Sequence, residues 1–123
     1  MHDTTCLVPN CRHVGDPVQL TVSRVDEGHR TRVLVGGEID IATAAELRSA
    51  LELAVRPGIT DLVIDLTDVT FMDSSGVRAL LLAARGAKAL RTEVSLLVPA
   101  SNTAVGRVLD VLQIGLTIPI VAH

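Results

Sequence analysis

Aromatic side chains are almost absent from this 123-residue chain, which has one Phe and no Trp or Tyr. Apolar residues still make up 48% of the sequence, so the core must be built from Val, Leu, Ile and Ala. A positive charge excess is missing too, because the net charge is −3. Proteins that bind nucleic acid usually carry a basic stripe, or aromatic side chains on which bases stack. The composition therefore argues against nucleic acid as a partner.

Long apolar runs are absent as well. The longest, residues 79–84 and 115–122, are far shorter than the roughly 20 residues needed to cross a bilayer. The N-terminus shows no basic segment followed by an apolar run, so no signal peptide is evident. These observations predict a cytoplasmic protein with no membrane partner. The length is that of one ordinary domain.

Cysteine is scarce, with only Cys6 and Cys11, both near the N-terminus. Together with His2 and His13 they suggest a metal site. The C-x4-C spacing is wider than in a structural zinc knuckle, however, and no second cysteine pair follows. We therefore predict no metal or cofactor and two free thiols, with a local disulfide as the alternative under oxidising conditions. Residues 1–17 show little periodicity and predict a weakly ordered arm.

The rest of the chain, residues 18–123, is predicted to form a single domain. Alternating or continuous β-branched runs predict strands, and apolar residues at i, i+3, i+4 and i+7 predict helices. The predicted strands are residues 18–23, 31–36, 62–66, 93–98 and 116–121, and the predicted helices begin near residues 43, 75 and 101. This order implies a hairpin followed by βαβ units with right-handed crossovers. The fold class is therefore α/β, with a mixed, mostly parallel sheet of four to five strands.

Local signals mark the ends of several predicted elements. Thr43 and Glu46 fit the S/T-x-x-E capping box, which predicts a helix start at Thr43. Ser101 is predicted to cap the last helix. Pro119 lies within the last predicted strand and places that strand at a sheet edge.

The main candidate for a functional site is the segment of residues 69–77 (VTFMDSSGV). Here a strand leads into Asp73, Ser74, Ser75 and Gly76 and then into a helix. In open α/β sheets, functional groups gather just beyond the carboxyl ends of the strands. One interpretation is a simple helix cap, worth about 0.5–2 kcal/mol. A single capping residue is enough for that, and three consecutive polar residues exceed the need.

Two further interpretations give the serines a chemical role. A nucleophile elbow needs G-x-S-x-G and a later histidine base, but here the flanks differ and the only later histidine is the terminal His123. A serine hydrolase is therefore not predicted. Alternatively, a serine accepts a phosphoryl group, held by the free N–H groups and the positive end of the helix dipole. That modification adds about −1.5 to −2 charges beside Asp73 and can abolish docking.

Two segments together resemble the anti-sigma-factor antagonists of the bacterial STAS-domain family. Residues 37–40 (GEID), followed by Thr43-Ala44, resemble the family's GELD…TA segment. Residues 71–77 (FMDSSGV) resemble its F-[ML]-D-S-[ST]-G-[LV] phosphorylation loop. The resemblance runs from about residue 18 to residue 121 and implies a STAS fold, with helices packed mainly on one side of the sheet.

The resemblance also implies a regulatory function and a protein that is not an enzyme. The unmodified protein would bind an anti-sigma factor that is also a serine kinase of the ATPase fold, and so free a sigma factor for transcription. That kinase would phosphorylate Ser74, the first serine of the motif, and a PP2C-type phosphatase would restore the binding form. A second role of the same fold stays open, as a subunit of a transporter or lipid-trafficking complex or as a sensory scaffold.

Carried over residue by residue, the resemblance makes Ser74 the phosphorylation site. Asp73 would orient Ser74 and contribute to partner docking. Ser75 and Gly76 would begin the helix, with Gly76 permitting close approach of the partner backbone.

The same docking surface would include Glu38 and Asp40 on the neighbouring loop. Arg78 departs from the family, in which apolar or small residues are common at this position. It is expected either to pair with a phosphate on Ser74, to contact the partner, or to be an ordinary solvated helix residue.

Overall fold

The computed structural model describes residues 4–6 and 20–121. Cys11, the N-terminal histidines and the predicted boundary after residue 17 lie outside the described residues, so the predictions for them stay predictions. In the described ranges, no group of three or more His, Cys, Asp or Glu side chains is placed to hold a metal ion. None of the helices in those ranges is long and apolar enough to span a membrane.

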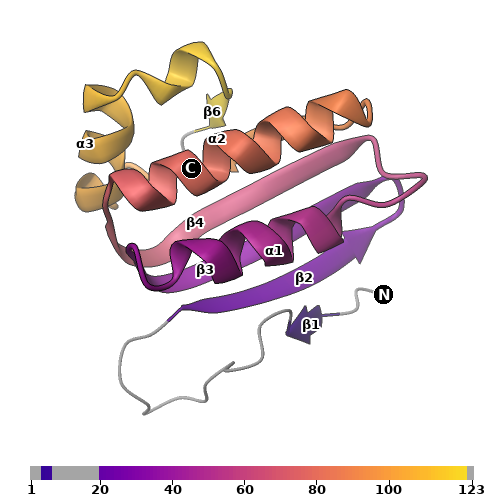
Figure 1. The fold of residues 1–123 in the computed structure, drawn as a ribbon, viewed down its shortest axis with the longest axis horizontal. Helices are drawn as coiled ribbons and strands as arrows, with labels where there is room; N and C mark the ends of the chain where they lie inside the picture. The colour runs from indigo at the N-terminus through magenta and orange to yellow at the C-terminus, as the bar shows by residue number, and fades with distance from the viewer. Residues whose placement is uncertain (1–3, 7–19, 122–123) are drawn as a thin grey trace.

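Six strands form one sheet, and their order in space follows their order in the chain (Figure 1). The strands are β1 Thr4–Cys6, β2 Thr21–Glu27, β3 Arg30–Ile39, β4 Asp61–Met72, β5 Glu93–Leu97 and β6 Ile120–Val121. The β1–β2 and β2–β3 pairs are antiparallel, and the β3–β4, β4–β5 and β5–β6 pairs are parallel. The predicted mixed, mostly parallel α/β fold is confirmed. The sheet has one strand more than expected, because β1 pairs with β2 from within the predicted arm.

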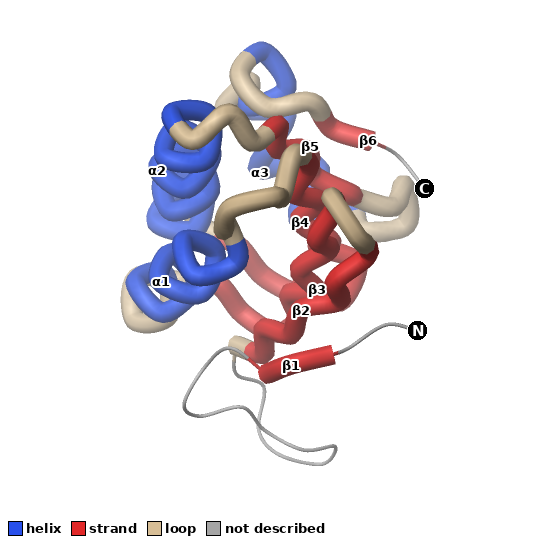
Figure 2. Tube along the Cα trace, turned by 90° about the vertical axis from the view of Figure 1, so that its right-hand side faces the viewer, coloured by secondary structure: helices blue, strands red, loops and turns tan. Residues whose placement is uncertain are grey.

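Two helices, α1 (Ala44–Ala54) and α2 (Ser74–Ala89), cover one face of the sheet and pack against each other (Figure 2). They connect β3 to β4 and β4 to β5, so the chain crosses the sheet in the same direction twice. Since such crossovers are right-handed, both helices lie on the same face. The third helix, α3 (Thr103–Val111), packs against β4, and η1 (Ile114–Leu116) leads from it towards β6.

The core is a layer of aliphatic side chains between the sheet and these two helices. Val33, Ile64 and Leu96 stand side by side on three neighbouring strands, and each is fully buried. Leu47 of α1 and Leu80 of α2 are also fully buried. Burying one such side chain contributes about 1.5–3 kcal/mol, which explains how a chain with a single Phe forms a stable core.

Strand β4 is longer than the predicted strand over residues 62–66 and extends well past the end of β5. Its pairing with β3 shifts register twice between Leu34 and Ile39. Such bulges bend a strand without ending it. The polar residues near the motif therefore belong to the strand, and β4 runs directly into the helix that follows.

The C-terminal elements differ from two of the predictions. The N-cap of α3 is Asn102 and not Ser101, because the Asn102 side chain accepts a hydrogen bond of 3.3 Å from the Val105 N–H. Strand β6 contains only two residues, since η1 occupies the beginning of the predicted strand. Pro119 directly precedes β6, which lies at the sheet edge as predicted.

Candidate functional site

The loops that follow β3 and β4 meet at one end of the sheet. Glu38 pairs with Phe71, and Ile39 pairs with Met72, across the parallel ladder. The Asp73 N–H then donates to the Ile39 carbonyl oxygen at 3.2 Å. The two segments that carry the family resemblance are therefore neighbours in space.

Asp73 is the N-cap of α2. Its Oδ1 accepts hydrogen bonds from the Ser75 N–H at 2.8 Å and the Gly76 N–H at 3.4 Å. Its carbonyl oxygen accepts from the N–H groups of Gly76 at 3.1 Å and Val77 at 3.2 Å. The helix cap expected in this motif is thus present at Asp73. Of the N–H groups expected to be free for a phosphate, those of Ser75, Gly76 and Val77 are already bonded, and only the Ser74 N–H has no acceptor among the described residues.

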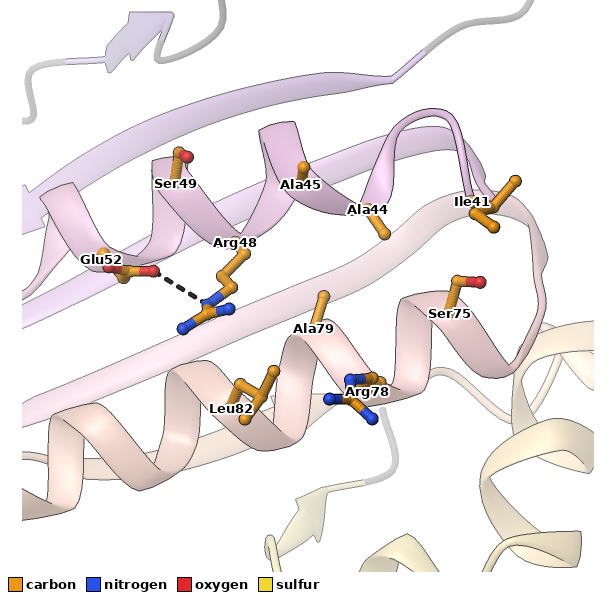
Figure 3. A pocket seen from close by; sticks show the side chains of 10 residues that line it. All are labelled: Ile41, Ala44, Ala45, Arg48, Ser49, Glu52, Ser75, Arg78, Ala79 and Leu82. Carbon is orange, nitrogen blue, oxygen red and sulfur yellow. Dashed lines mark ion pairs between the residues drawn. The ribbon is translucent and has the colours of Figure 1, made fainter.

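The two serines of the motif differ in exposure. Ser74 is the first residue of α2 and is exposed, and its hydroxyl forms no hydrogen bond with any residue that the structure describes. Ser75 is half-buried and lines a groove between α1 and α2 (Figure 3). The hydroxyl that a large partner can reach is therefore the Ser74 hydroxyl.

Gly76 is buried, and the space beside its Cα is filled from within the protein. An added Cβ would lie 2.6 Å from Ile39 Cγ2 and 2.8 Å from Met72 Cγ, closer than Cβ atoms are found. The glycine thus lets α2 pack closely on the ends of β3 and β4. The close approach at Gly76 is internal, and the predicted approach of a partner backbone finds no support.

Asp40 organises the loop after β3. Its Oδ1 accepts from the N–H groups of Ala42 at 2.9 Å and Thr43 at 3.1 Å. The Thr43 hydroxyl donates to the Glu38 carbonyl oxygen at 3.0 Å. Thr43 is the N-cap residue of α1, as predicted, but its side chain makes no cap bond, so the predicted capping box with Glu46 is not formed. The Asp40 carboxylate is used inside the loop, whereas the Glu38 side chain is exposed.

The groove between α1 and α2 is open and has a volume of about 510 Å³. Its α1 side carries an ion pair between Arg48 Nε and Glu52 Oε1 at 3.1 Å, and Figure 3 shows Arg48 reaching towards α2. On the α2 side, Arg78 is exposed one turn beyond Ser75. Within the described part of the chain, Arg78 has no ion pair. The groove therefore presents one uncommitted cation close to the serines.

Two exposed apolar side chains at this end of the sheet were missed as site residues. Ile41 is 83% exposed and Phe71 is 46% exposed. Ile41 lies in a polar turn where no strand or helix requires an apolar residue, and Phe71 is the single aromatic of the chain. Aromatic residues are enriched at the centres of protein interfaces. These two signals point to a surface that binds a protein.

Asn102 is a third residue that sequence reasoning missed. Its Nδ2 donates to the carbonyl oxygens of Leu66 at 3.1 Å and Val69 at 2.8 Å. Both carbonyls belong to the part of β4 that β5 does not cover. Asn102 therefore ties the start of α3 to the strand that delivers Asp73. The sequence around it signals a helix cap and gives no hint of the second role.

The structure argues against a serine nucleophile. His29 is the only histidine among residues 4–6 and 20–121, and its Nδ1 lies 3.2 Å from the Gly58 carbonyl oxygen. The adjacent Arg30 pairs with Asp61 at the beginning of β4, whereas Ser74 follows the end of β4. No described histidine can therefore act as a base for the serines. The arrangement suits binding of a protein or acceptance of a group.

A family model described as "Mlab, STAS domain" matches residues 16–117. The anti-sigma-F factor antagonist RsfB of Mycobacterium tuberculosis is 41% identical over 64 residues, which are 52% of this chain and 52% of that protein. The anti-sigma-B factor antagonist of Listeria monocytogenes is 41% identical over 61 residues, 49% of this chain and 52% of that protein. The chain thus aligns with about half the length of these curated relatives.

Among solved structures, an anti-sigma factor antagonist from Mycobacterium paratuberculosis superposes with a TM-score of 0.76. It is 27% identical, and the match covers 87% of this chain and 89% of that one. The anti-sigma factor antagonist SpoIIAA, in its unphosphorylated form, superposes with a TM-score of 0.66 at 22% identity. The match covers 87% of this chain and 88% of that one, and it shows the shared fold alone. The names of all these proteins describe regulatory binding and not catalysis, in agreement with the prediction that the chain is not an enzyme.

Proposed function

The chain belongs to the STAS-domain family, and from that premise we propose that it is an anti-sigma-factor antagonist. In this proposal the unphosphorylated protein binds an anti-sigma factor that is also a serine kinase, and thereby frees a sigma factor. Phosphorylation of Ser74 ends the binding. A PP2C-type phosphatase then restores the binding form, and all partners are in the cytoplasm.

The observation that carries the proposal is the exposed hydroxyl of Ser74 at the start of α2, which bonds to none of the residues that the structure describes. A kinase can reach it without unfolding the helix. Transfer of the γ-phosphoryl group of ATP to Ser74 Oγ releases the hydroxyl proton and ADP. The resulting charge of about −1.5 to −2 lies beside Asp73, where like-charge repulsion and the cost of desolvation oppose burial in an interface.

The names of the relatives support the same function. The curated relatives are antagonists of anti-sigma-F and anti-sigma-B factors, and the most similar of the solved structures named above is an anti-sigma factor antagonist. Both motifs of the resemblance lie at one end of the sheet, as a shared binding surface requires.

A direct test measures binding to candidate anti-sigma kinases by calorimetry, with and without ATP. Ser74→Ala is expected to bind as the wild type does and to stay bound when ATP is added. Ser74→Asp is expected to bind at least about tenfold more weakly, a loss of about 1.4 kcal/mol. Ser75→Ala is the matched control, and ATP should release it normally. Release of Ser74→Ala by ATP would contradict the mechanism.

A second measurement locates the phosphate. After incubation with kinase and ATP, mass spectrometry of proteolytic fragments should find one added phosphate, on Ser74. The half-buried Ser75 should remain unmodified. Modification of Ser75 alone would move the switch to the groove and contradict the proposed site.

The proposed docking surface combines Glu38, Asp73 and Ser74 with the exposed Ile41 and Phe71. Because the Glu38 side chain is exposed, a charge reversal there should slow association.

Glu38→Lys is therefore expected to weaken kinase binding and to reduce its salt dependence. Glu93→Lys is the matched control, since Glu93 is exposed on β5 and pairs with Asp61 at the opposite end of β4. Equal losses for both variants would mean that the effect comes from net charge and not from this surface.

A second candidate function is a STAS subunit of a transporter or lipid-trafficking complex, or a sensory scaffold. It is kept because the family match identifies the STAS domain alone, and the curated relatives align over about half their length. Affinity capture that recovers an ABC-type ATPase and no small kinase would favour it.

A further inference from the structure

A phosphate on Ser74 finds most of the usual anion-binding site at the N-terminus of α2 occupied, since only the Ser74 N–H has no acceptor among the described residues. The Asp73 carboxylate already accepts from the N–H groups of Ser75 and Gly76, and the Val77 N–H is bonded to the Asp73 carbonyl oxygen. Asp73 is itself an anion one residue away, so it also repels the phosphate. The modified serine therefore needs a different counter-charge.

Arg78 is placed to supply that charge. Residues four apart on a helix share a face, with Cβ atoms about 5–6 Å apart. At 3.6 residues per turn, Arg78 lies only about 40° around the axis from Ser74. Arg78 is exposed, and no ion pair joins it to another residue in the described ranges. The other arginine of the groove, Arg48, is already paired with Glu52.

We propose that Arg78 is the intramolecular counter-ion of phosphorylated Ser74, an inference that rests on the proposed function for the identity of the modified residue. Its guanidinium donates to two phosphate oxygens, in the paired geometry that arginine forms with phosphate. Without the phosphate, Arg78 remains free beside the groove and can contact an acidic group of the partner (Figure 3).

Phosphorylation of Ser74 then acts on the docking surface in two ways. It adds negative charge at the start of α2, and it withdraws Arg78, a cation of the groove that no other described residue pairs. A partner that binds Arg78 would lose that contact at the moment the phosphate appears. This double effect explains why an arginine is useful where the family commonly has apolar or small residues.

The test uses protein with phosphoserine placed at position 74 during translation by an expanded genetic code. A ³¹P NMR titration then reads the pKa of the second ionisation of the phosphate. Arg78 stabilises the dianion, so Arg78→Gln should raise this pKa and Arg78→Lys should keep most of the lowering. The acidic side chains of Glu38 and Asp73 act in the opposite sense and are the same in every variant.

Arg85→Gln is the matched control, since Arg85 is also an exposed arginine of α2. Along the helix axis, Arg85 lies about 16 Å from Ser74. That distance is greater than the Debye length of about 10 Å at 0.1 M salt. It should therefore leave the titration midpoint unchanged. In 1 M NaCl the difference between wild type and Arg78→Gln should shrink.

Two results would overturn the inference. One is an unchanged midpoint in Arg78→Gln, and the other is an equal shift in Arg85→Gln, which would mean a general field effect. Because phosphoserine is incorporated without a kinase, failure of candidate kinases to modify Ser74 would count against the proposed function alone.

Discussion

The loops after β3 and β4 are built from the same kinds of residue but use them differently. Each contains an aspartate that binds two backbone N–H groups, Asp40 in the turn before α1 and Asp73 at the N-cap of α2. In the first loop, which Asp40 organises, the Thr43 hydroxyl donates to the Glu38 carbonyl oxygen. In the second, which Asp73 caps, the Ser74 hydroxyl bonds to none of the residues described. In the first loop the hydroxyl is bonded within the loop, whereas in the second the Ser74 hydroxyl is available to a partner.

The residue type alone therefore does not tell whether a hydroxyl beside a helix cap has a function. What matters is whether the fold itself uses the hydroxyl. The Thr43 hydroxyl contributes to stability, so a substitution there should lower the free energy of unfolding. The Ser74 hydroxyl contributes little to stability, so a substitution there should change phosphorylation and partner binding instead.

The largest effect is expected where the two loops touch, at Gly76. An alanine Cβ there would clash with Ile39 from the first loop's strand and with Met72 from the second's. Gly76→Ala should lower the free energy of unfolding by about 1–3 kcal/mol, as overpacking does. Urea denaturation measures this. Gly86→Ala is the matched control, because no atom lies within 4 Å of its added Cβ, and it should stabilise the helix by up to about 1 kcal/mol.

The next effect comes from removing the cap that the second loop depends on. Asp73→Ala leaves the Ser75 N–H without its acceptor and removes one of the two acceptors of the Gly76 N–H. It should cost about 0.5–2 kcal/mol in thermal unfolding followed by circular dichroism. Asp73→Asn keeps an acceptor oxygen and should lie close to the wild type. If both variants lost the same stability, charge and not capping would be the cause.

A smaller loss is expected from the first loop's hydroxyl. Thr43→Val keeps the shape of the side chain but removes the bond to the Glu38 carbonyl oxygen, and should cost about 0.5–1.5 kcal/mol. The same substitution at the exposed Thr103, which begins α3, is the control and should cost less. Equal effects in urea denaturation would show that the Thr43 bond contributes nothing.

The smallest effect on stability is expected at Ser74. Ser74→Ala removes a hydroxyl without a described partner, so the free energy of unfolding should change by less than about 0.5 kcal/mol. The same variant should lose all phosphorylation at this position. A stability loss as large as that of Thr43→Val would remove the distinction between the two loops.

The fold class could be predicted from sequence because it depends on periodicity that is repeated along the chain. The order of strands and helices, the aliphatic core and the cap at the β4–α2 junction all follow from local patterns. Whether the capping box at Thr43 forms could not be predicted from the local pattern. Its pattern is local, but the Thr43 hydroxyl is taken by Glu38, five residues earlier, through the folded path of the loop.

The length of β4 and the role of Asn102 depend on tertiary contacts. The predicted strand over residues 62–66 stops short of the observed end, because pairing with β3 continues through two bulges to Met72. The Asn102 amide binds carbonyls of β4 that are 33 and 36 residues away in the chain. The exposure of Ile41 and Phe71 could not be predicted from sequence either, because the sequence does not show whether an apolar side chain faces the core or the solvent.

The sheet's strand order also has a consequence for synthesis. Because space order follows chain order from β1 to β6, no strand has to be inserted between two that have already paired. Each new strand can add to the edge that the preceding one presents, and the loops to be closed are short. We expect the ends of β3 and β4 beside Ser74 to pair on the ribosome once α2 has formed, and the Asn102 contacts with β4 to be added when α3 follows.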